Sequence, residues 1–342
     1  MTLGTPSLGT FTGAEAVELA LVERNGFAES RHLGSAVVLG PDGTVVRALG
    51  NPNALIFPRS SMKPFQAIAV MGAGVPLEGP AAVLATASHG GTPAHLSVVL
   101  GLLAQAQLPE AALQCPRDWP LDSGAREAVI RAGETKRPLF MNCSGKHAAM
   151  LLACVANGWP TDTYLDPQHP LQVRIRETVE RLTGEKVAAT AVDGCGAPVY
   201  AMSLEALARG IHRIATASPG SPFALYRNAA ILRNAVLADG WAIDGPGRAN
   251  TVVIDRLGVF AKLGAEGVMV MAAADGTTVA LKVLDGSLRA ASIVALRLLV
   301  DAGAVASADV DALAPELDLA VLGGGAPVGS IKVAYPANTA PA

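Results

Sequence analysis

The sequence predicts an α+β fold in which strands from both ends of the chain form one antiparallel sheet and the middle is helical. Strand-like segments lie near the two ends, whereas apolar residues in between recur at helical spacing. The most economical packing places a helix against this sheet and inserts a helical lobe, which leaves a cleft at the seam. We therefore expect a single unit over residues 1–342, with a sheet lobe at about 10–75 and 250–342 and a mostly helical lobe at about 76–249.

The strand segments are bounded by turn signals. The sequence Gly-Pro-Asp-Gly at 40–43 and the pair Asp275-Gly276 each separate two β-prone runs, as in antiparallel hairpins. The expected strands are Val17–Glu23, Gly34–Leu39, Thr44–Leu49, Val268–Ala273, Thr277–Val283 and Ser330–Tyr335.

The helical segments follow from a different periodicity. From Met62, apolar residues recur at helical spacing until Gly72 and Gly74 end the pattern. The clearest further helices are His95–Gln107, Lys146–Asn157, Pro170–Thr183, Leu204–Ala217, Pro222–Ala238 and Ser287–Ala302.

Composition excludes several classes of protein. The 342 residues carry 26 Lys and Arg against 29 Asp and Glu, with no basic run, so we expect no nucleic-acid partner. The longest apolar stretches, such as Ala148–Ala156, are shorter than the roughly 20 residues of a membrane-spanning helix, so we expect no membrane association. The N-terminus has no secretory signal pattern, and we expect a cytoplasmic protein whose four cysteines are thiols.

A serine and a lysine lie three positions apart in the sequence FPRSSMKP at 57–64, where a loop becomes a helix. Residues at i and i+3 share a helix face, so Ser60 Oγ and Lys63 Nζ can meet, whereas Ser61 is two positions away from the lysine and cannot. A lysine kept neutral by burial or by a second cation can take the proton of a serine nucleophile. The alternative is structural, with Ser60 as a helix N-cap and Lys63 as a solvated residue of the first turn.

A second lysine, Lys262, occurs in FAKLGAEG at 260–267, immediately before the predicted strand Val268–Ala273. Serine-lysine acyl-transfer enzymes bring a second cation to the site on such a lysine, followed by a glycine that lets backbone approach, as in their S-x-x-K and K-T-G motifs. Here leucine replaces the threonine. The alternative is a surface lysine at the start of a strand.

The loop at 87–92 supplies a third polar group. A second serine relays protons between the nucleophile and the strand lysine in such sites, so Ser88 is a candidate to bond Lys262. The ordinary alternative is a helix cap at Ser88 or Thr92. We expect His89 to be a structural neighbour, because the spacing supports no Ser-His-Asp arrangement.

Two cysteines lie in glycine-rich loops, Cys143 in NCSGKH at 142–147 and Cys195 in DGCGAP at 193–198. Two thiolates and a neighbouring donor could hold Zn²⁺, but neither C-x-x-C nor H-E-x-x-H is present, so spacing alone does not favour a metal site. Cys115 and Cys154 have no polar neighbours and are expected to be buried apolar residues.

Together these motifs resemble the type II asparaginase family, typified by the inducible rhizobial L-asparaginases. The resemblance covers most of the chain in the family's order, at residues 22–34, 57–66, 87–91, 142–150, 193–201 and 261–268. It implies a fold like that of serine β-lactamases, penicillin-binding proteins and serine-dependent glutaminases. It also implies hydrolysis of L-asparagine to L-aspartate and ammonia by a homodimeric enzyme.

The resemblance assigns catalytic roles to four residues. Ser60 with Lys63 matches the family's first Ser-Lys tandem, and Ser88 with Lys262 matches its second. The loop departs from the family's pattern, because it reads SHGGT at 88–92 where many relatives carry SHSGE. This difference bears on loop conformation and substrate preference but leaves both tandems intact.

The resemblance also implies a zinc site. Cys143, Lys146 and Cys195 match zinc ligands close to the catalytic serine, with Asp193 nearby through water. Lysine must bind a metal unprotonated, and the charge of the metal favours that form. We expect the zinc to position substrate or shape the site rather than to generate the nucleophile.

Other functions are compatible with the same motifs. A glutaminase or another amidase could use the same Ser-Lys machinery, because one methylene changes binding by only about 1 to 3 kcal/mol. A catalytically inactive amino-acid-binding protein is a second alternative. Arg24, Arg31 and Arg59 could each hold a substrate α-carboxylate through a bidentate guanidinium, and the sequence does not rank them.

Overall fold

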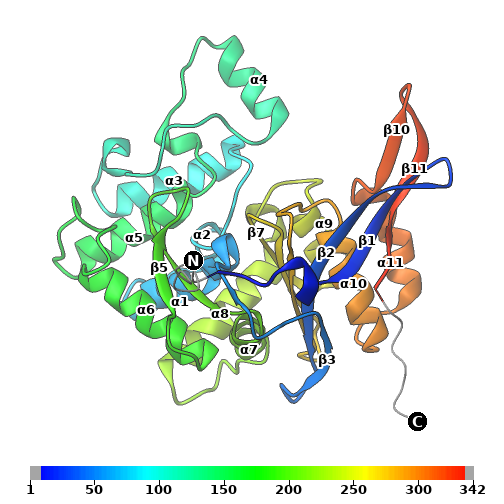
Figure 1. Cartoon of the computed structure of the whole chain (residues 1–342). Coiled ribbons are helices and arrows are strands. Elements are labelled where there is room, and N and C mark those ends of the chain that lie inside the picture. Colours follow the sequence, from blue (N-terminus) through cyan, green and yellow to red (C-terminus); the bar gives the residue numbers. More distant parts are fainter. Residues whose placement is uncertain (1–8, 336–342) are drawn as a thin grey trace, which may run out of the picture.

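An eight-stranded antiparallel sheet forms the centre of one side of the molecule (Figure 1). The computed structural model describes residues 9–335. Along the sheet the order is β10-β11-β1-β2-β9-β8-β7, with β3 paired to β2. The strands are β1 (Val17–Arg24), β2 (Phe27–Leu39), β3 (Val45–Leu49), β7 (Phe260–Gly264), β8 (Val268–Ala272), β9 (Thr278–Val283), β10 (Ala320–Gly323) and β11 (Ala326–Val333).

The predicted α+β class is confirmed, because strands from both ends of the chain share this sheet. All six expected strands are present, and both predicted turns join antiparallel neighbours. Strand β2 begins at Phe27 rather than Gly34. The sequence did not reveal this first part as a strand, because most of its residues are solvent-exposed and lack apolar alternation. The sequence analysis missed β7 and β10, and β7 has a buried lysine at its centre that breaks the apolar pattern.

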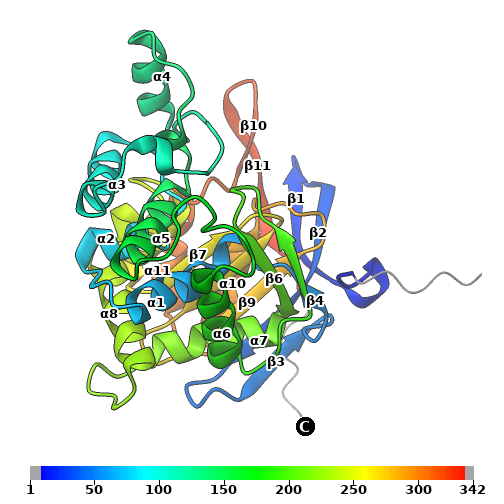
Figure 2. The same cartoon turned by 90° about the vertical axis from the view of Figure 1, so that its left-hand side faces the viewer.

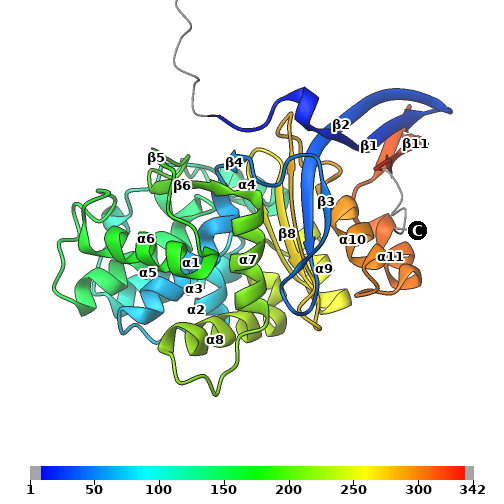
Figure 3. The ribbon, with the colours of Figure 1, turned by 60° about the horizontal axis from the view of Figure 1, so that its bottom comes forward.

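Helices cover both faces of the sheet. Helix α7 (Leu204–Ala215) packs on β2, β8 and β9, and α10 (Ala291–Asp301) packs on β8 and β9 from the opposite side (Figure 3). Helix α7 is strongly amphipathic and buries a stripe of apolar residues against the sheet. Helix α11 (Ser307–Leu313) lies beside α10. Within residues 9–335, the structure contains no helix of the length and apolarity that crossing a membrane requires.

The middle of the chain is helical, as expected, and packs on the far side of α7 (Figures 1 and 3). Helix α1 lies at its centre against α5, α6 and α8, while α4 projects from the body and buries none of its residues. These helices are α1 (Lys63–Gly72), α2 (Gly79–Leu84), α3 (Pro93–Gln105), α4 (Ser123–Arg131), α5 (Ser144–Ala156), α6 (Pro170–Thr183), α8 (Ala224–Ala238) and α9 (Ala249–Leu257). The predicted helices are all present, with Pro170–Thr183 matched at both ends.

A small sheet connects the two sides of the molecule. Its order is β4-β6-β5, formed by β4 (Leu55–Ile56), β5 (Ala189–Val192) and β6 (Pro198–Ser203) (Figure 2). Strand β6 runs directly into α7, and β4 runs into the segment that carries Ser60. The small sheet therefore fixes where that segment begins.

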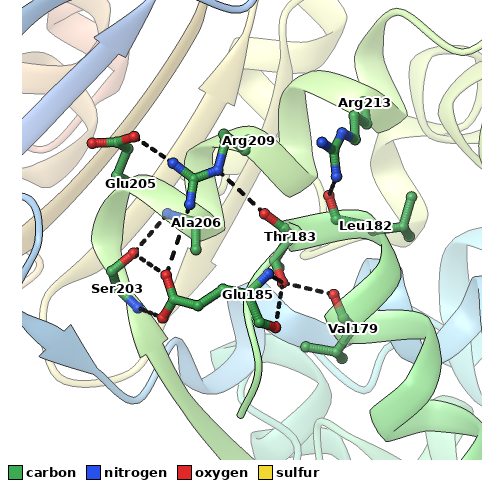
Figure 4. A network of polar contacts seen from close by, with 9 residues as sticks. All are labelled: Val179, Leu182, Thr183, Glu185, Ser203, Glu205, Ala206, Arg209 and Arg213. Carbon is green, nitrogen blue, oxygen red and sulfur yellow. Dashed lines mark hydrogen bonds and ion pairs between the residues drawn. The ribbon is translucent and has the colours of Figure 1, made fainter. Parts of the chain in front are cut away.

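A polar network holds the start of α7 against the end of α6 (Figure 4). Ser203 caps α7 by accepting a hydrogen bond from the Ala206 amide, and its own amide and hydroxyl both donate to the Glu185 carboxylate, at 2.8 and 2.6 Å. Arg209 bonds Glu205 and the Thr183 carbonyl. Helix caps of this kind stabilise the helix that they terminate.

Replacing Ser203 by alanine should lower the free energy of unfolding by about 1 to 2 kcal/mol, because the α7 cap and a donor to Glu185 are lost together. Urea denaturation followed by circular dichroism measures the change. The control is Ser218→Ala, which removes an exposed serine of a turn and should change the free energy by less than about 0.5 kcal/mol. Equal effects of the two substitutions would contradict this role of Ser203.

Candidate active site

Ser60 lies in a short 3₁₀ turn, η2 (Arg59–Met62), that leads into α1. Ser60 is half-buried, and its hydroxyl makes no hydrogen bond within residues 9–335. The neighbouring Ser61 is fully buried, and its hydroxyl donates to the Lys262 carbonyl at 3.1 Å. Ser61 thus has a structural partner, and Ser60 has the hydroxyl that is free to react. Helix α1 begins after Ser60, so the interpretation of this serine as the helix N-cap is wrong.

The turn η2 rests directly on β7 at Gly264. A Cβ atom at this glycine would lie 2.3 Å from the Pro58 carbonyl oxygen and 3.0 Å from Ser61 Oγ. Such contacts are shorter than atoms tolerate, so a residue with a side chain would push η2 away. The expectation that the glycine of K-x-G allows close backbone approach is confirmed. Lys262 was expected just before a strand, but it lies at the centre of β7 itself.

Two buried lysines share one serine hydroxyl. Lys63 Nζ lies 2.9 Å from Ser88 Oγ, and Lys262 Nζ lies 3.1 Å from the same atom. Each amine also donates to a main-chain carbonyl, Lys63 to Ala87 at 2.5 Å and Lys262 to Leu263 at 2.9 Å. Lys63 is 1% exposed and Lys262 is 0% exposed, so the alternative of solvated surface lysines is wrong for both.

The structure therefore brings Lys63, Ser88 and Lys262 together, with Ser60 one helical turn before Lys63. It shows no hydrogen bond between Ser60 Oγ and Lys63 Nζ. A neutral amine has two N–H donors and one lone pair. The bonds of Lys63 to Ala87 and Ser88 use two donors, so in its neutral form this amine would keep its lone pair free to accept a proton.

Burial and the neighbouring Lys63 cation lower the pKa of Lys262 to about 7. The buried carboxylate of Asp244 opposes this shift. Two ammonium groups that share one hydroxyl repel each other, so one proton leaves the pair near neutral pH. Ser88 contacts both amines, so its hydroxyl can pass a proton between them.

The loop that carries Ser88 is fixed on both sides. The Ser88 amide donates to the Ile243 carbonyl at 2.9 Å, and the His89 amide donates to Asn142 at 3.1 Å. His89 Nε2 lies 2.9 Å from Ser144 Oγ, and burial lowers the pKa of His89 well below its usual value. His89 is thus a neutral structural neighbour, as expected. Thr92, rather than Ser88, is the residue that caps the following helix.

Cys143, Lys146 and Cys195 form a second buried group at the start of α5. The two sulfurs contact each other, and Lys146 Nζ lies 3.0 Å from Cys195 Sγ. A hydrogen bond from Cys143 and the charge of Lys146 lower the pKa of Cys195, which favours its thiolate. Burial opposes a charge on Lys146, but the Cys195 and Cys143 sulfurs outweigh it and raise the pKa of that lysine. Cys115 and Cys154 are buried, and all four cysteines are free thiols, as expected.

These three residues could hold a zinc ion. Two sulfurs and one amine are suitable donors once Lys146 has lost its proton. In the described part of the chain, no three His, Cys, Asp or Glu side chains converge as a metal-binding group. A metal here would therefore depend on the lysine as its third protein ligand.

Of the three candidate arginines, Arg59 lies beside Ser60. Its Nε donates to Asp193 Oδ1 at 2.6 Å, and its backbone has a positive φ of 51°. Arg24 pairs with Glu29, and Arg31 pairs with Glu18, both on the exposed β1–β2 arm. These two pairs leave Arg59 as the arginine that the fold brings to the site.

Sequence reasoning missed Asp244 and Asn250, which are buried near Lys262. Asn250 Nδ2 donates to Asp244 Oδ2 at 3.2 Å, and Arg248 binds the other carboxylate oxygen at 2.5 Å. The signal in the sequence was the glycine-rich run IDGPGR at 243–248, which resembles an ordinary loop. Its importance depends on its contact with the Ser88 loop, which no local pattern reveals.

Comparison with known protein families gives one extensive match. Residues 20–333 match the family described as L-asparaginase II. None of the curated proteins compared with the chain matches it.

Several solved structures are distantly similar. A Bacillus glutaminase is 13% identical with a TM-score of 0.45, covering 80% of this chain and 92% of its own. A β-lactamase from Mycobacterium bovis is 15% identical with a TM-score of 0.44, covering 79% and 94% of the two chains. A putative β-lactamase from Bacteroides dorei is 15% identical with a TM-score of 0.41, covering 81% and 93%.

Replacing Gly264 by alanine should displace η2, because the added methyl collides with the Pro58 carbonyl. We expect a loss of about 1 to 3 kcal/mol in unfolding free energy, together with faster hydrogen exchange of the amides at 61–63. Thermal denaturation and hydrogen exchange read by mass spectrometry measure these effects.

The matched control for this substitution is Gly101→Ala, in the exposed middle of α3, where an added Cβ meets nothing within 4 Å. It should leave stability unchanged or raise it by up to about 1 kcal/mol. Unaltered exchange at 61–63 in the Gly264 variant would refute the proposed contact.

Proposed function

Because the chain belongs to the L-asparaginase II family, and is thus an amidohydrolase, we propose that it hydrolyses L-asparagine to L-aspartate and ammonia through an acyl-enzyme on Ser60. The observation that carries this proposal is the pair of buried lysines joined by Ser88, one turn from a serine whose hydroxyl is free. Lys262 loses its proton near pH 7 and shares Ser88 with Lys63, so this pair of lysines can supply a neutral amine as a general base. The fold implied by this family is that of serine β-lactamases and glutaminases.

In the first step, neutral Lys63 accepts the Ser60 proton and Ser60 Oγ attacks the side-chain amide carbon. The C–O bond forms and the C–N bond breaks, and the leaving nitrogen takes the proton from Lys63 to depart as ammonia. Lys262, once neutral, takes a proton from Lys63 through Ser88, which leaves Lys63 neutral and able to accept the Ser60 proton. Water then attacks the aspartyl ester, gives its proton back through Lys63, and releases aspartate and Ser60.

The start of η2 supplies a donor for the oxyanion. Its first internal hydrogen bond runs from the Ser61 amide to the Pro58 carbonyl, so the Ser60 amide precedes that bond. A helix start leaves such amides without internal partners. A preorganised N–H at this position stabilises the charge that develops on the substrate oxygen.

Arg59 is our candidate for the substrate α-carboxylate. Asp193 binds its Nε and orients the guanidinium. The terminal nitrogens, one of which lies 3.8 Å from the exposed Glu266 carboxylate, can form a bidentate contact with a substrate. If Arg59 holds the α-carboxylate at a fixed distance from Ser60, the side-chain amide of asparagine and that of a larger amino acid reach different positions relative to Ser60 Oγ. Glutamine is the alternative substrate, and comparing ammonia release from the two amino acids tests the preference.

We propose that Cys143, Lys146 and Cys195 hold zinc, with Asp193 nearby. Bound there, the ion would shape the site and help to orient substrate without supplying the nucleophile. The Cys143 end of α5 bonds the Ser88 loop through Asn142, so the thiol group and the Ser-Lys group share a support. A homodimer in the cytoplasm remains our expectation for the assembly and its location.

Replacing Ser60 by alanine should reduce kcat by about 10³-fold or more, because the nucleophile is removed. Coupled detection of ammonia measures the rate. The matched control is Ser61→Ala, which removes the adjacent hydroxyl and its bond to the Lys262 carbonyl and should reduce kcat far less.

A metal-hydroxide mechanism would give the opposite result. In that case a chelator would abolish turnover while the Ser60 variant remained active. Labelling of Ser60 by an acylating asparagine analogue, read by mass spectrometry, separates an enzyme from a catalytically inactive binding protein.

The rate should rise with pH through about 7, because the amine pair must lose a proton before Lys63 can act as base. The Lys262→Met variant lacks the second cation, so the midpoint of this acidic limb should move to higher pH and the rate at pH 7 should fall at least tenfold. A pH profile of kcat/KM measures both. Lys186→Met, which removes a surface lysine, should leave the midpoint unchanged. An unshifted midpoint in the Lys262 variant would exclude this coupling.

A further inference from the structure

A cavity of about 250 Å³ that opens to the surface lies beside Arg59 and the first strand of the small sheet. None of Ser60, Lys63, Ser88 and Lys262 lines it. Its walls are apolar where β4 and β6 pass. The rest of the lining includes Gly9 and Thr10 together with three charged residues, Arg59, Glu266 and Lys282. Cavities for drug-sized ligands have volumes of about 300 to 1,000 Å³, so this cavity suits a smaller molecule.

Lys282 is a buried cation without a carboxylate partner. It lies on β9 with 8% of its surface exposed, and its Nζ donates to the carbonyls of Glu266 at 2.5 Å and Val283 at 2.8 Å. An ammonium has three donors, so one is left over, and no ion pair of Lys282 exists within residues 9–335. Burial lowers its pKa, and the charges of Glu266 and Asp285 oppose this shift. A buried cation of this kind is stabilised by an anion.

Two residues on the cavity wall have a strained backbone. Arg59 and Glu266 have φ angles of 51° and 62°, and they are two of the five non-glycine residues with positive φ in the described part of the chain. Such conformations cost of order 1 to 3 kcal/mol and cluster where ligands are held. The turn at Glu266 directs its carbonyl to Lys282, and the turn at Arg59 leads into Ser60.

We propose that this cavity binds a short aliphatic monocarboxylate, with its carboxylate on Lys282 and its hydrocarbon body against the wall of Leu55 and Ala201. The Glu266 carboxylate also lines the cavity, but it is 66% exposed and its Oε1 lies 3.8 Å from Arg59 Nη1, so the guanidinium offsets part of its charge. A dicarboxylic amino acid would place a second charge against the apolar wall. Because Arg59 separates the cavity from Ser60, occupancy also changes the rate of amide hydrolysis, and this last point rests on the proposed function.

Isothermal titration calorimetry with 3-methylbutanoate tests the site. The full chain and its Ser60→Ala variant should bind equally, whereas Lys282→Met should weaken binding at least tenfold by removing the cation. Ala201→Leu should also weaken binding at least tenfold, because the larger side chain fills part of the cavity while Lys282 is unchanged. The uncharged 3-methylbutan-1-ol should bind at least tenfold more weakly than the acid. Thermal denaturation checks that each variant is folded.

Several outcomes would overturn the proposal. They are no binding to the unmodified chain, unchanged affinity in both cavity variants, or displacement of the acid by L-aspartate in the Ser60 variant. If the chain binds the acid but hydrolyses neither asparagine nor glutamine, the proposed function is wrong and the proposed cavity site is still supported. Binding without any effect on turnover would overturn the coupling through Arg59.

Discussion

One hydroxyl shared by two buried amines is the contact on which the site depends. Ser88 lies within 3.1 Å of both Lys63 and Lys262, and neither amine reaches solvent. Water would otherwise screen the two charges and allow both to persist. In this dry environment their repulsion has to be relieved by the loss of a proton. The packing that buries the two lysines is therefore also what lowers the pKa of Lys262.

That packing is assembled from distant parts of the chain. Lys63 comes from the start of α1, Ser88 from a loop bonded to Ile243 and Asn142, and Lys262 from the edge strand β7. Gly264 allows η2 to lie directly on β7, which sets the distance between the serine turn and the strand lysine. A shift in any of these supports would therefore lengthen the contacts of the amines with Ser88.

Much of this could be predicted from the sequence. The α+β class, the six strands and the main helices followed from periodicity and turns, and the spacing of Ser60 and Lys63 pointed to one helix face. Strand β7 could not be predicted, because a buried lysine interrupts its apolar pattern. Asp244, Asn250 and Lys282 also escaped notice, since a polar residue in a loop or strand is ordinarily solvated. Only tertiary packing, which local patterns do not encode, makes their charges consequential.

The pairing of β1 with β11 has a consequence for how the protein is made. Ala20 lies opposite Val333, so the second edge of β1 stays uncovered until β11, far along the chain, has been synthesised. During translation that edge stays open to other chains. The sheet cannot close before β11 has been synthesised, and ordering of such long-range contacts is slow.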